Sequence, residues 1–325
     1  MSSNSVIIPV ASGKGGVGKS LITANLAVSL ANAGHSTVVI DLDLGGSNLY
    51  SYLGLENKYP GIGDYFSSKK GKLIDYLVQT NFPNLRFLAG ECRVTFMANL
   101  PYAQKIKLIR EIKSIPADYV LLDLGAGTSF NTLDYFDLSR NGIVVSTFEK
   151  PSILNTLSFI KNFIFRMVQK EVRKNHKILS SVNELYKTSA ESNPVTISSV
   201  MEIVEKMDSA LASNIIDKYK QYHPRIIFNK AEHPDEMKIS EQLEKSVTKN
   251  LSIDLWFFGL IYRDKLVETS IKNNQVLVSE YPESIATKGI NDIARRIVKF
   301  QDNYMANSNN LLQKDSMEKF ELWGL

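Results

Sequence analysis

The chain has 325 residues, of which 44% are hydrophobic and 22% are charged, and its formal net charge is +4. These values suit an ordinary soluble globular protein, and the mild charge does not require a nucleic-acid partner. The single cysteine, Cys92, excludes an intrachain disulfide and a CxxC metal or redox pair. We therefore expect a reducing, cytoplasmic location.

Membrane insertion is not expected from the sequence. The first residues, MSSNSVIIPVAS, lack a basic segment and a long apolar run, so they do not resemble a secretory signal. No apolar stretch reaches the roughly 18 residues of a membrane-spanning helix. Any membrane contact is expected to be peripheral, at the inner face of the plasma membrane.

The N-terminal third has the pattern of a βαβ unit. Val6–Ala11 is a short β-branched apolar run, which predicts a buried strand that ends in a glycine-rich loop. Leu21–Gly34 has apolar residues at helical spacing and a glycine at its end. Ser36–Asp43 is a second apolar strand that ends in carboxylates. A strand, a loop, a helix and a strand in this order favour a parallel sheet.

The same alternation continues along the chain. Further strands are predicted at Asn84–Gly90, Asp118–Gly127, Asn141–Thr147, Arg225–Lys230 and Ile253–Leu260. Helical patterns lie between or after them, as in Pro101–Ser114 and Glu283–Phe300. We predict one α/β domain over residues 1–302, with a doubly wound, mostly parallel sheet flanked by helices. Such sheets bind ligands at the carboxyl ends of their strands.

Two segments exceed a minimal fold of this kind. Residues 165–224 are polar and helix-prone, which predicts a helical insertion between two strands. Its basic residues, Arg166 and Lys170 among them, suggest contact with DNA or lipid, although a solvated helix face is the simpler interpretation. Residues 303–325 form a tail in which part of one face of a short amphipathic helix would be shared by Leu312, Met317, Phe320, Trp323 and Leu325. That face would pack on its own domain or a partner, or contact a membrane.

The loop ASGKGGVGKS, from Ala11 to Ser20, fits the general phosphate-binding pattern. Its glycines allow successive backbone N–H groups to surround phosphates, and the helix that follows directs its positive dipole end at them. Lys19 would pair with phosphate oxygens and Ser20 would bind Mg²⁺. The predicted nucleotide-binding residues are Gly13, Gly15, Gly16, Val17, Gly18, Lys19, Ser20 and Leu21.

Two strand ends carry carboxylates. DLDLGGSN places Asp41 and Asp43 two residues apart, where a pair of carboxylates suits Mg²⁺-bound water and an attacking water. YVLLDLGAG delivers Asp123 at the end of an apolar strand, as in a Walker B segment. An ordinary turn after each strand is the alternative interpretation.

Together these motifs resemble the deviant Walker A ATPases of the MinD/ParA group. Within that group, the stretch DLDLGGSNL and the block LDLGAGTSFNTLDYF are most similar to flagellar-number regulators of the FlhG (FleN, YlxH) type. The extra lysine, Lys14, matches the signature residue of the group. The resemblance implies that Lys14 reaches phosphates held by a second copy across a dimer interface, which would couple dimerisation to catalysis.

The resemblance also implies roles for other residues. Asp43 would position the attacking water, and Asp41 and Asp123 would bind Mg²⁺ through water. Lys14, Lys19 and Asp43 would be the catalytic residues. Asn229 would read the adenine edge, and a simple helix cap is the alternative for this residue.

The function implied is a Mg²⁺-dependent ATPase that dimerises with ATP, hydrolyses it slowly and is read by a regulatory protein partner. It would control the number or position of a cellular structure, the flagellum first. Three alternatives remain: a septum-positioning or DNA-partition ATPase, a P-loop metabolic ligase, and a nucleotide-binding scaffold without turnover. An iron–sulfur carrier would need paired cysteines that this chain lacks.

Overall fold

The structure, a computed structural model, describes residues 5–68, 71–90, 100–188, 195–301, 303 and 305–324. The first four residues and Cys92, which entered two expectations above, lie outside this description. In the described parts of the chain, none of the helices combines the length and the apolar character that crossing a bilayer requires.

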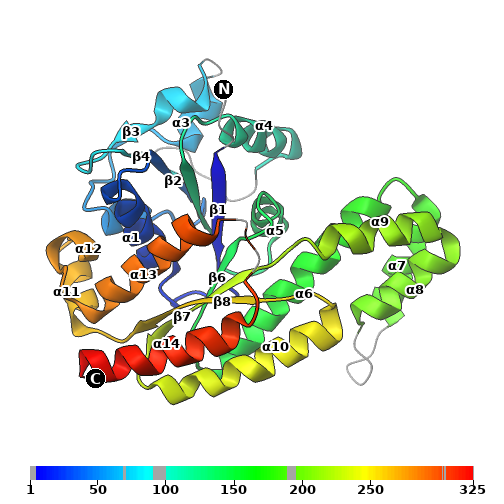
Figure 1. Cartoon of the computed structure of the whole chain (residues 1–325). Helices are drawn as coiled ribbons and strands as arrows, with labels where there is room; N and C mark the ends of the chain where they lie inside the picture. The colour runs from blue at the N-terminus through cyan, green and yellow to red at the C-terminus, as the bar shows by residue number, and fades with distance from the viewer. Residues whose placement is uncertain are drawn as a thin grey trace.

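One eight-stranded sheet organises the chain, with the strand order β3-β4-β2-β5-β1-β6-β7-β8 (Figure 1). All pairings are parallel except that of β3 with β4. The strands are β1 (Val6–Ala11), β2 (Thr37–Leu42), β3 (Val78–Gln79), β4 (Leu85–Leu88), β5 (Tyr119–Leu124), β6 (Ile143–Ser146), β7 (Arg225–Ala231) and β8 (Trp256–Tyr262). The predicted doubly wound α/β fold is confirmed. The two-residue strand β3 was not predicted, because it is too short for a hydrophobic period.

Helices cover both faces of the sheet. One face packs on α1 (Lys19–Asn32), α2 (Leu49–Tyr52), α11 (Lys265–Lys272), α12 (Leu277–Glu280) and α13 (Ile285–Phe300). The other packs on α3 (Ile62–Ser68), α4 (Tyr102–Lys113), α5 (Phe130–Phe136), α6 (Lys150–Val172) and α10 (Lys238–Leu251), with the single turns η1 (Leu73–Tyr76) and η2 (Pro234–Met237). Successive strand residues alternate between the two cores, as in Leu121 and Leu122, because side chains of a strand point to opposite faces.

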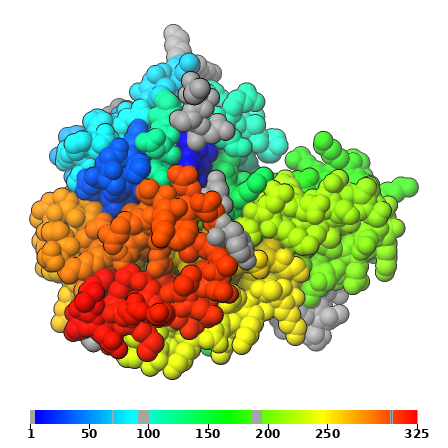
Figure 2. All heavy atoms as spheres, in the orientation of Figure 1, coloured from blue at the N-terminus to red at the C-terminus, as the bar shows by residue number. Residues whose placement is uncertain are grey.

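Three further helices form a helical extension beside the sheet. They are α7 (His176–Thr188), α8 (Ile197–Met207) and α9 (Ser209–Tyr219), and they project to the right in Figures 1 and 2. Apolar residues such as Val182 and Val200 continue the core of the α6 face into the extension. The segment predicted as a helical insertion is therefore the end of α6 followed by these three helices.

The C-terminal helix α14 (Ser308–Trp323) lies beside β8, the edge strand (Figure 1). The backbone N–H of Phe257 donates to Ser308 Oγ over 3.0 Å, and the Tyr262 hydroxyl donates to the Ser316 carbonyl over 2.8 Å. Leu312 is buried, and Phe320 and Trp323 pack against the same core. The tail therefore packs on its own domain.

Candidate nucleotide-binding site

The glycine-rich loop connects β1 to α1 and is held closely by its neighbours. A Cβ at Gly13 would lie 2.2 Å from the carbonyl oxygen of Asn155 in α6, so no larger residue fits there. Gly18 caps α1 with φ 91°, in the left-handed region that glycine tolerates best. The first backbone N–H groups of α1 are consequently presented at the carboxyl edge of the sheet, as a phosphate site requires.

Lys19 and Asp123 form a buried ion pair beneath this loop. Lys19 Nζ lies 2.7 Å from Asp123 Oδ1, and the two side chains are 7% and 0% exposed. Thr23, one turn along α1, donates to the same carboxylate oxygen over 3.1 Å. The ammonium group of Lys19, which was predicted to bind phosphate, therefore contacts the carboxylate of Asp123, which was predicted from the Walker B pattern.

Asp41 and Asp123 are direct neighbours, because β2 and β5 pair in the register Asp41↔Asp123. Asp41 accepts hydrogen bonds from Ser47 Oγ and from the backbone N–H groups of Asp43 and Leu49, at 2.7, 3.0 and 3.1 Å. Burial, and then the negative charge of Asp123, raise the pKa of Asp41 to about 7 despite these bonds. Of these two adjacent buried carboxylates, Asp123 is ion-paired with Lys19, whereas Asp41 is held by hydrogen bonds.

These residues fit a divalent cation. In the described part of the chain, Asp123 Oδ2 is a buried oxygen without a hydrogen-bond partner. A cation near Ser20 would offset the carboxylate pair, and its bound waters would satisfy that oxygen. Among the described residues, no group of three or more His, Cys, Asp or Glu side chains forms a direct metal cage. Such a cage is not needed where hydroxyl, phosphate and water oxygens are the ligands.

Asp43 follows β2, and its backbone N–H donates to Asp41 Oδ1 over 3.0 Å. Its carboxylate lies beside Gly46 in its own loop and Gly125 in the loop after β5. It lines a cavity of about 620 Å³ between these two loops.

Lys14 is partly exposed at the outer side of the loop. Its ammonium group forms a 2.8 Å ion pair with Glu149, which precedes α6, and the side chains are 31% and 61% exposed. The carboxylate of Glu149 was not singled out in the sequence, although it follows the strand β6 at the ligand-binding edge of the sheet. An exposed pair of this kind contributes little stability, so Lys14 is available for another partner at small cost.

Asn229 ends up against the glycine-rich loop. Its Nδ2 donates to the Val17 carbonyl over 2.8 Å, and a Cβ at Gly18 would lie 2.3 Å from that nitrogen. The next residue, Lys230, donates to the Gly16 carbonyl over 3.0 Å. Neither contact is a helix cap, so the end of β7 braces the loop.

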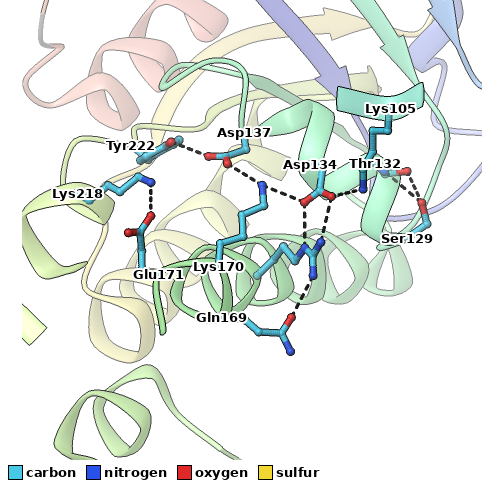
Figure 3. A network of polar contacts seen from close by, with 11 residues as sticks. Lys105, Ser129, Thr132, Asp134, Asp137, Gln169, Lys170, Glu171, Lys218 and Tyr222 are labelled. Carbon is cyan, nitrogen blue, oxygen red and sulfur yellow. Dashed lines mark hydrogen bonds and ion pairs between the residues drawn. The ribbon is translucent and has the colours of Figure 1, made fainter. Parts of the chain in front are cut away.

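A second polar network, which the sequence did not reveal, anchors α5 behind the loop that follows β5 (Figure 3). Asp134 contacts Lys105 of α4 and both Arg166 and Lys170 of α6. Asp137 accepts from Lys170 at 2.8 Å and from Tyr222 at 2.6 Å. Arg166 and Lys170, expected on a solvated face or at DNA or lipid, are partly exposed and ion-paired with α5.

Comparison with known proteins identifies the family. A profile described as the CobQ/CobB/MinD/ParA nucleotide binding domain matches residues 8–278. Two curated relatives come from Helicobacter pylori. The septum site-determining protein MinD is 34% identical over 38% of this chain and 45% of the relative. The flagellum site-determining protein YlxH is 29% identical over 49% of this chain and 53% of the relative.

The chain spans about half the length of the curated relatives that it matches. A solved structure with the same fold is the septum site-determining protein MinD of Pyrococcus horikoshii, complexed with Mg-ADP. The match covers 91% of this chain and 97% of the Pyrococcus chain, with a TM-score of 0.57 at 19% identity. The chain belongs to the CobQ/CobB/MinD/ParA nucleotide-binding domain family, in which it is similar to the MinD and YlxH proteins.

Proposed function

We propose that this protein is an ATP-driven dimerisation switch that hydrolyses ATP slowly and positions or counts a cellular structure. The observation that carries this proposal is the convergence of Lys19, Asp123 and Asp41 under a glycine-rich loop that also bears Lys14. Phosphates would draw Lys19 away from Asp123, and Mg²⁺ on Ser20 would then neutralise Asp41 and Asp123 through its bound waters. The Mg-ADP complex of the Pyrococcus relative supports this choice of ligand.

Asp43 would orient the attacking water. Asp43 belongs to the loop after β2, and its carboxylate lies beside Gly125 of the loop after β5, where the end of a bound triphosphate would be expected. A carboxylate that accepts a hydrogen bond from water directs the water's lone pair toward phosphorus. Lys14 would leave Glu149 and add its positive charge to the phosphates of a facing copy, so turnover would require two loaded chains.

The proposed switch is tested by light scattering on size-exclusion chromatography with ADP and then with ATP, with and without liposomes. ATP is expected to give a dimer, and Asp43→Ala is expected to retain that dimer because hydrolysis is blocked. Lys14→Ala should keep nucleotide affinity but lose dimerisation or turnover. Lys58→Ala, which breaks another exposed lysine–glutamate pair, is the matched control. An Asp43→Ala chain that stays monomeric in ATP, or a Lys14→Ala chain with normal turnover, would contradict the assignment.

The structure that is positioned is proposed to be the flagellum, because the relative YlxH is a flagellum site-determining protein. The MinD relatives favour the septum as the second candidate. Counting flagella and mapping division septa in cells that lack the gene separates the two. Unchanged flagella with misplaced septa would overturn the first choice.

A further inference from the structure

The cavity beside Asp43 extends well beyond the nucleotide-binding residues. It has a volume of about 620 Å³ and is lined by the loop after β2, including Asp43, and by the loop after β5 from Gly125 to Thr132. Its other walls are Tyr102 and Lys105 of α4 and Arg166 of α6. Any occupant would therefore contact both loops that flank the proposed γ-phosphate position.

The α4 and α6 side of the cavity carries surplus positive charge. Lys105, Arg166 and Lys170 share the carboxylates of Asp134 and Asp137 (Figure 3). A fourth cation, Arg173, lies 5.7 Å from the ring centre of Tyr102, and a third carboxylate, that of Asp43, lines the cavity at its loop side. Four cations thus meet three carboxylates. Lys105 is only 5% exposed and has donors beyond the one directed at Asp134.

The rim of the cavity is aromatic. Tyr102 is 61% exposed and Phe130 is 63% exposed, which is unusual for such large side chains. The Arg166 guanidinium lies 4.4 Å from the Phe130 ring centre, and the Lys105 ammonium lies 5.7 Å from that of Tyr102. These contacts hold the two rings in defined positions, while large apolar areas of both rings stay exposed to solvent. Fixed, exposed aromatic rings are typical anchor points of protein interfaces.

We propose that this cavity docks an acidic segment of a regulatory protein partner, with one carboxylate at Lys105 and an apolar side chain between Tyr102 and Phe130. This inference rests on the proposed function and names the partner's chemistry. One surplus positive charge matches a single carboxylate better than a chain of phosphates. The rings of Tyr102 and Phe130 are already covered on one side by cations, which favours an aliphatic or aromatic side chain between them over an intercalated nucleic-acid base. The docked segment would set the positions of Asp43 and the loop after β5, and with them the hydrolysis rate.

The test is selection of random peptides displayed on phage, using the full chain loaded with Mg²⁺ and a non-hydrolysable ATP analogue. The selected peptides are then synthesised with a fluorescent label and titrated by anisotropy. We expect Asp or Glu next to Phe, Leu or Trp, and binding about tenfold weaker in Lys105→Met, the loss of one charge-assisted hydrogen bond. Phe130→Ser should weaken binding similarly, and Lys113→Met, on the exposed side of α4, should not change it.

The peptides should also change ATP turnover in the wild-type chain but not in Phe130→Ser, a surface variant for which misfolding is not at issue. Peptides without acidic residues, or binding to both cavity variants that is as tight as binding to the wild type, would overturn the inference. So would Lys105-dependent binding of AMP in place of peptides, which would assign a second nucleotide site. Fluorescent ATP binding and dimer formation in the wild type are measured alongside, and their loss would overturn the proposed function instead.

Discussion

At the residue scale, the decisive feature is a pair of adjacent buried carboxylates, of which one is ion-paired with Lys19. Asp41 and Asp123 could be predicted from the sequence, because apolar strands ended at both residues. Their direct pairing, and the Thr23 hydroxyl on Asp123, could not, because strand register is a tertiary property. Lys14 was predicted as a functional residue, but its partner Glu149 lies 135 positions away in the chain.

The raised pKa of Asp41 leads to a pH prediction for the protein without nucleotide and metal. The unfolded chain ionises Asp41 near the ordinary pKa of 3.8, whereas burial raises the pKa of Asp41 in the folded chain to about 7. The free energy of unfolding should therefore fall as pH rises between these values, by at most about 4 kcal/mol. Urea unfolding in the presence of EDTA at pH 5 and at pH 8 measures this fall in the free energy of unfolding.

Asp41→Asn should remove most of this fall and be more stable than the wild type at pH 8. Asp217→Asn, on the exposed surface of α9, serves as the control and should leave the pH dependence intact. A pH dependence that survives in Asp41→Asn would show that another group is responsible.

Close packing of the glycine-rich loop gives a second residue-scale prediction. Gly13→Ala places a Cβ 2.2 Å from Asn155 O, whereas a Cβ at Gly15 meets nothing within 4 Å. Gly13→Ala is expected to lower the stability by about 1–3 kcal/mol, as overpacking does, and to weaken nucleotide binding. Gly15→Ala should leave the stability nearly unchanged. Thermal unfolding of the two variants decides this, and equal melting temperatures would contradict it.

At the element scale, α5 acts as the anchor of the loop that follows β5. The sequence predicted the strand β5 and its glycine turn but not the clamp on α5, because a charged residue on a short helix has no sequence pattern of its own. Burial opposes ionisation of Asp134, but hydrogen bonds from Arg166, Lys105 and Lys170 outweigh it and hold the pKa of Asp134 below its ordinary value. The clamp continues through Asp137 to Tyr222, which follows the helical extension.

Breaking this clamp should be costly. Asp134→Asn leaves three cations with reduced compensation, and we expect a loss of about 3–5 kcal/mol of unfolding free energy. Tyr222→Phe removes a single hydrogen bond to Asp137 and should cost about 1 kcal/mol. Urea unfolding compares the two. A smaller loss for Asp134→Asn than for Tyr222→Phe would show that the carboxylate is not the centre of the network.

At the scale of the whole molecule, the layers of sheet and helices follow from sequence periodicity. The arrangement of the helical extension and of α14 does not. Seven of the eight strands lie within segments that were predicted or overlap them, since apolar β-branched runs are strong signals. The helical extension was predicted as an insertion between two strands, but its division into α7, α8 and α9 was not. The face of α14 was partly misjudged: Leu312 is 2% exposed, but Met317, placed on the same stripe, is 53% exposed.

These two residues provide a matched pair. Leu312→Ala should destabilise the protein by about 2–5 kcal/mol because it leaves a cavity between α14 and the core. Met317→Ala should change the stability by no more than about 0.5 kcal/mol. Thermal unfolding tests the docked position of α14, and an equally small effect of both substitutions would mean that the helix is not packed on the domain in solution.

Both margins of the sheet are closed to strand addition. On one side the outermost strand, β3, has only two residues, and on the other α14 lies along β8, where Ser308 Oγ accepts from the backbone N–H of Phe257. Bare sheet margins tend to join edge to edge into fibres. The short strand and the covering helix therefore disfavour open-ended polymers that grow by strand pairing.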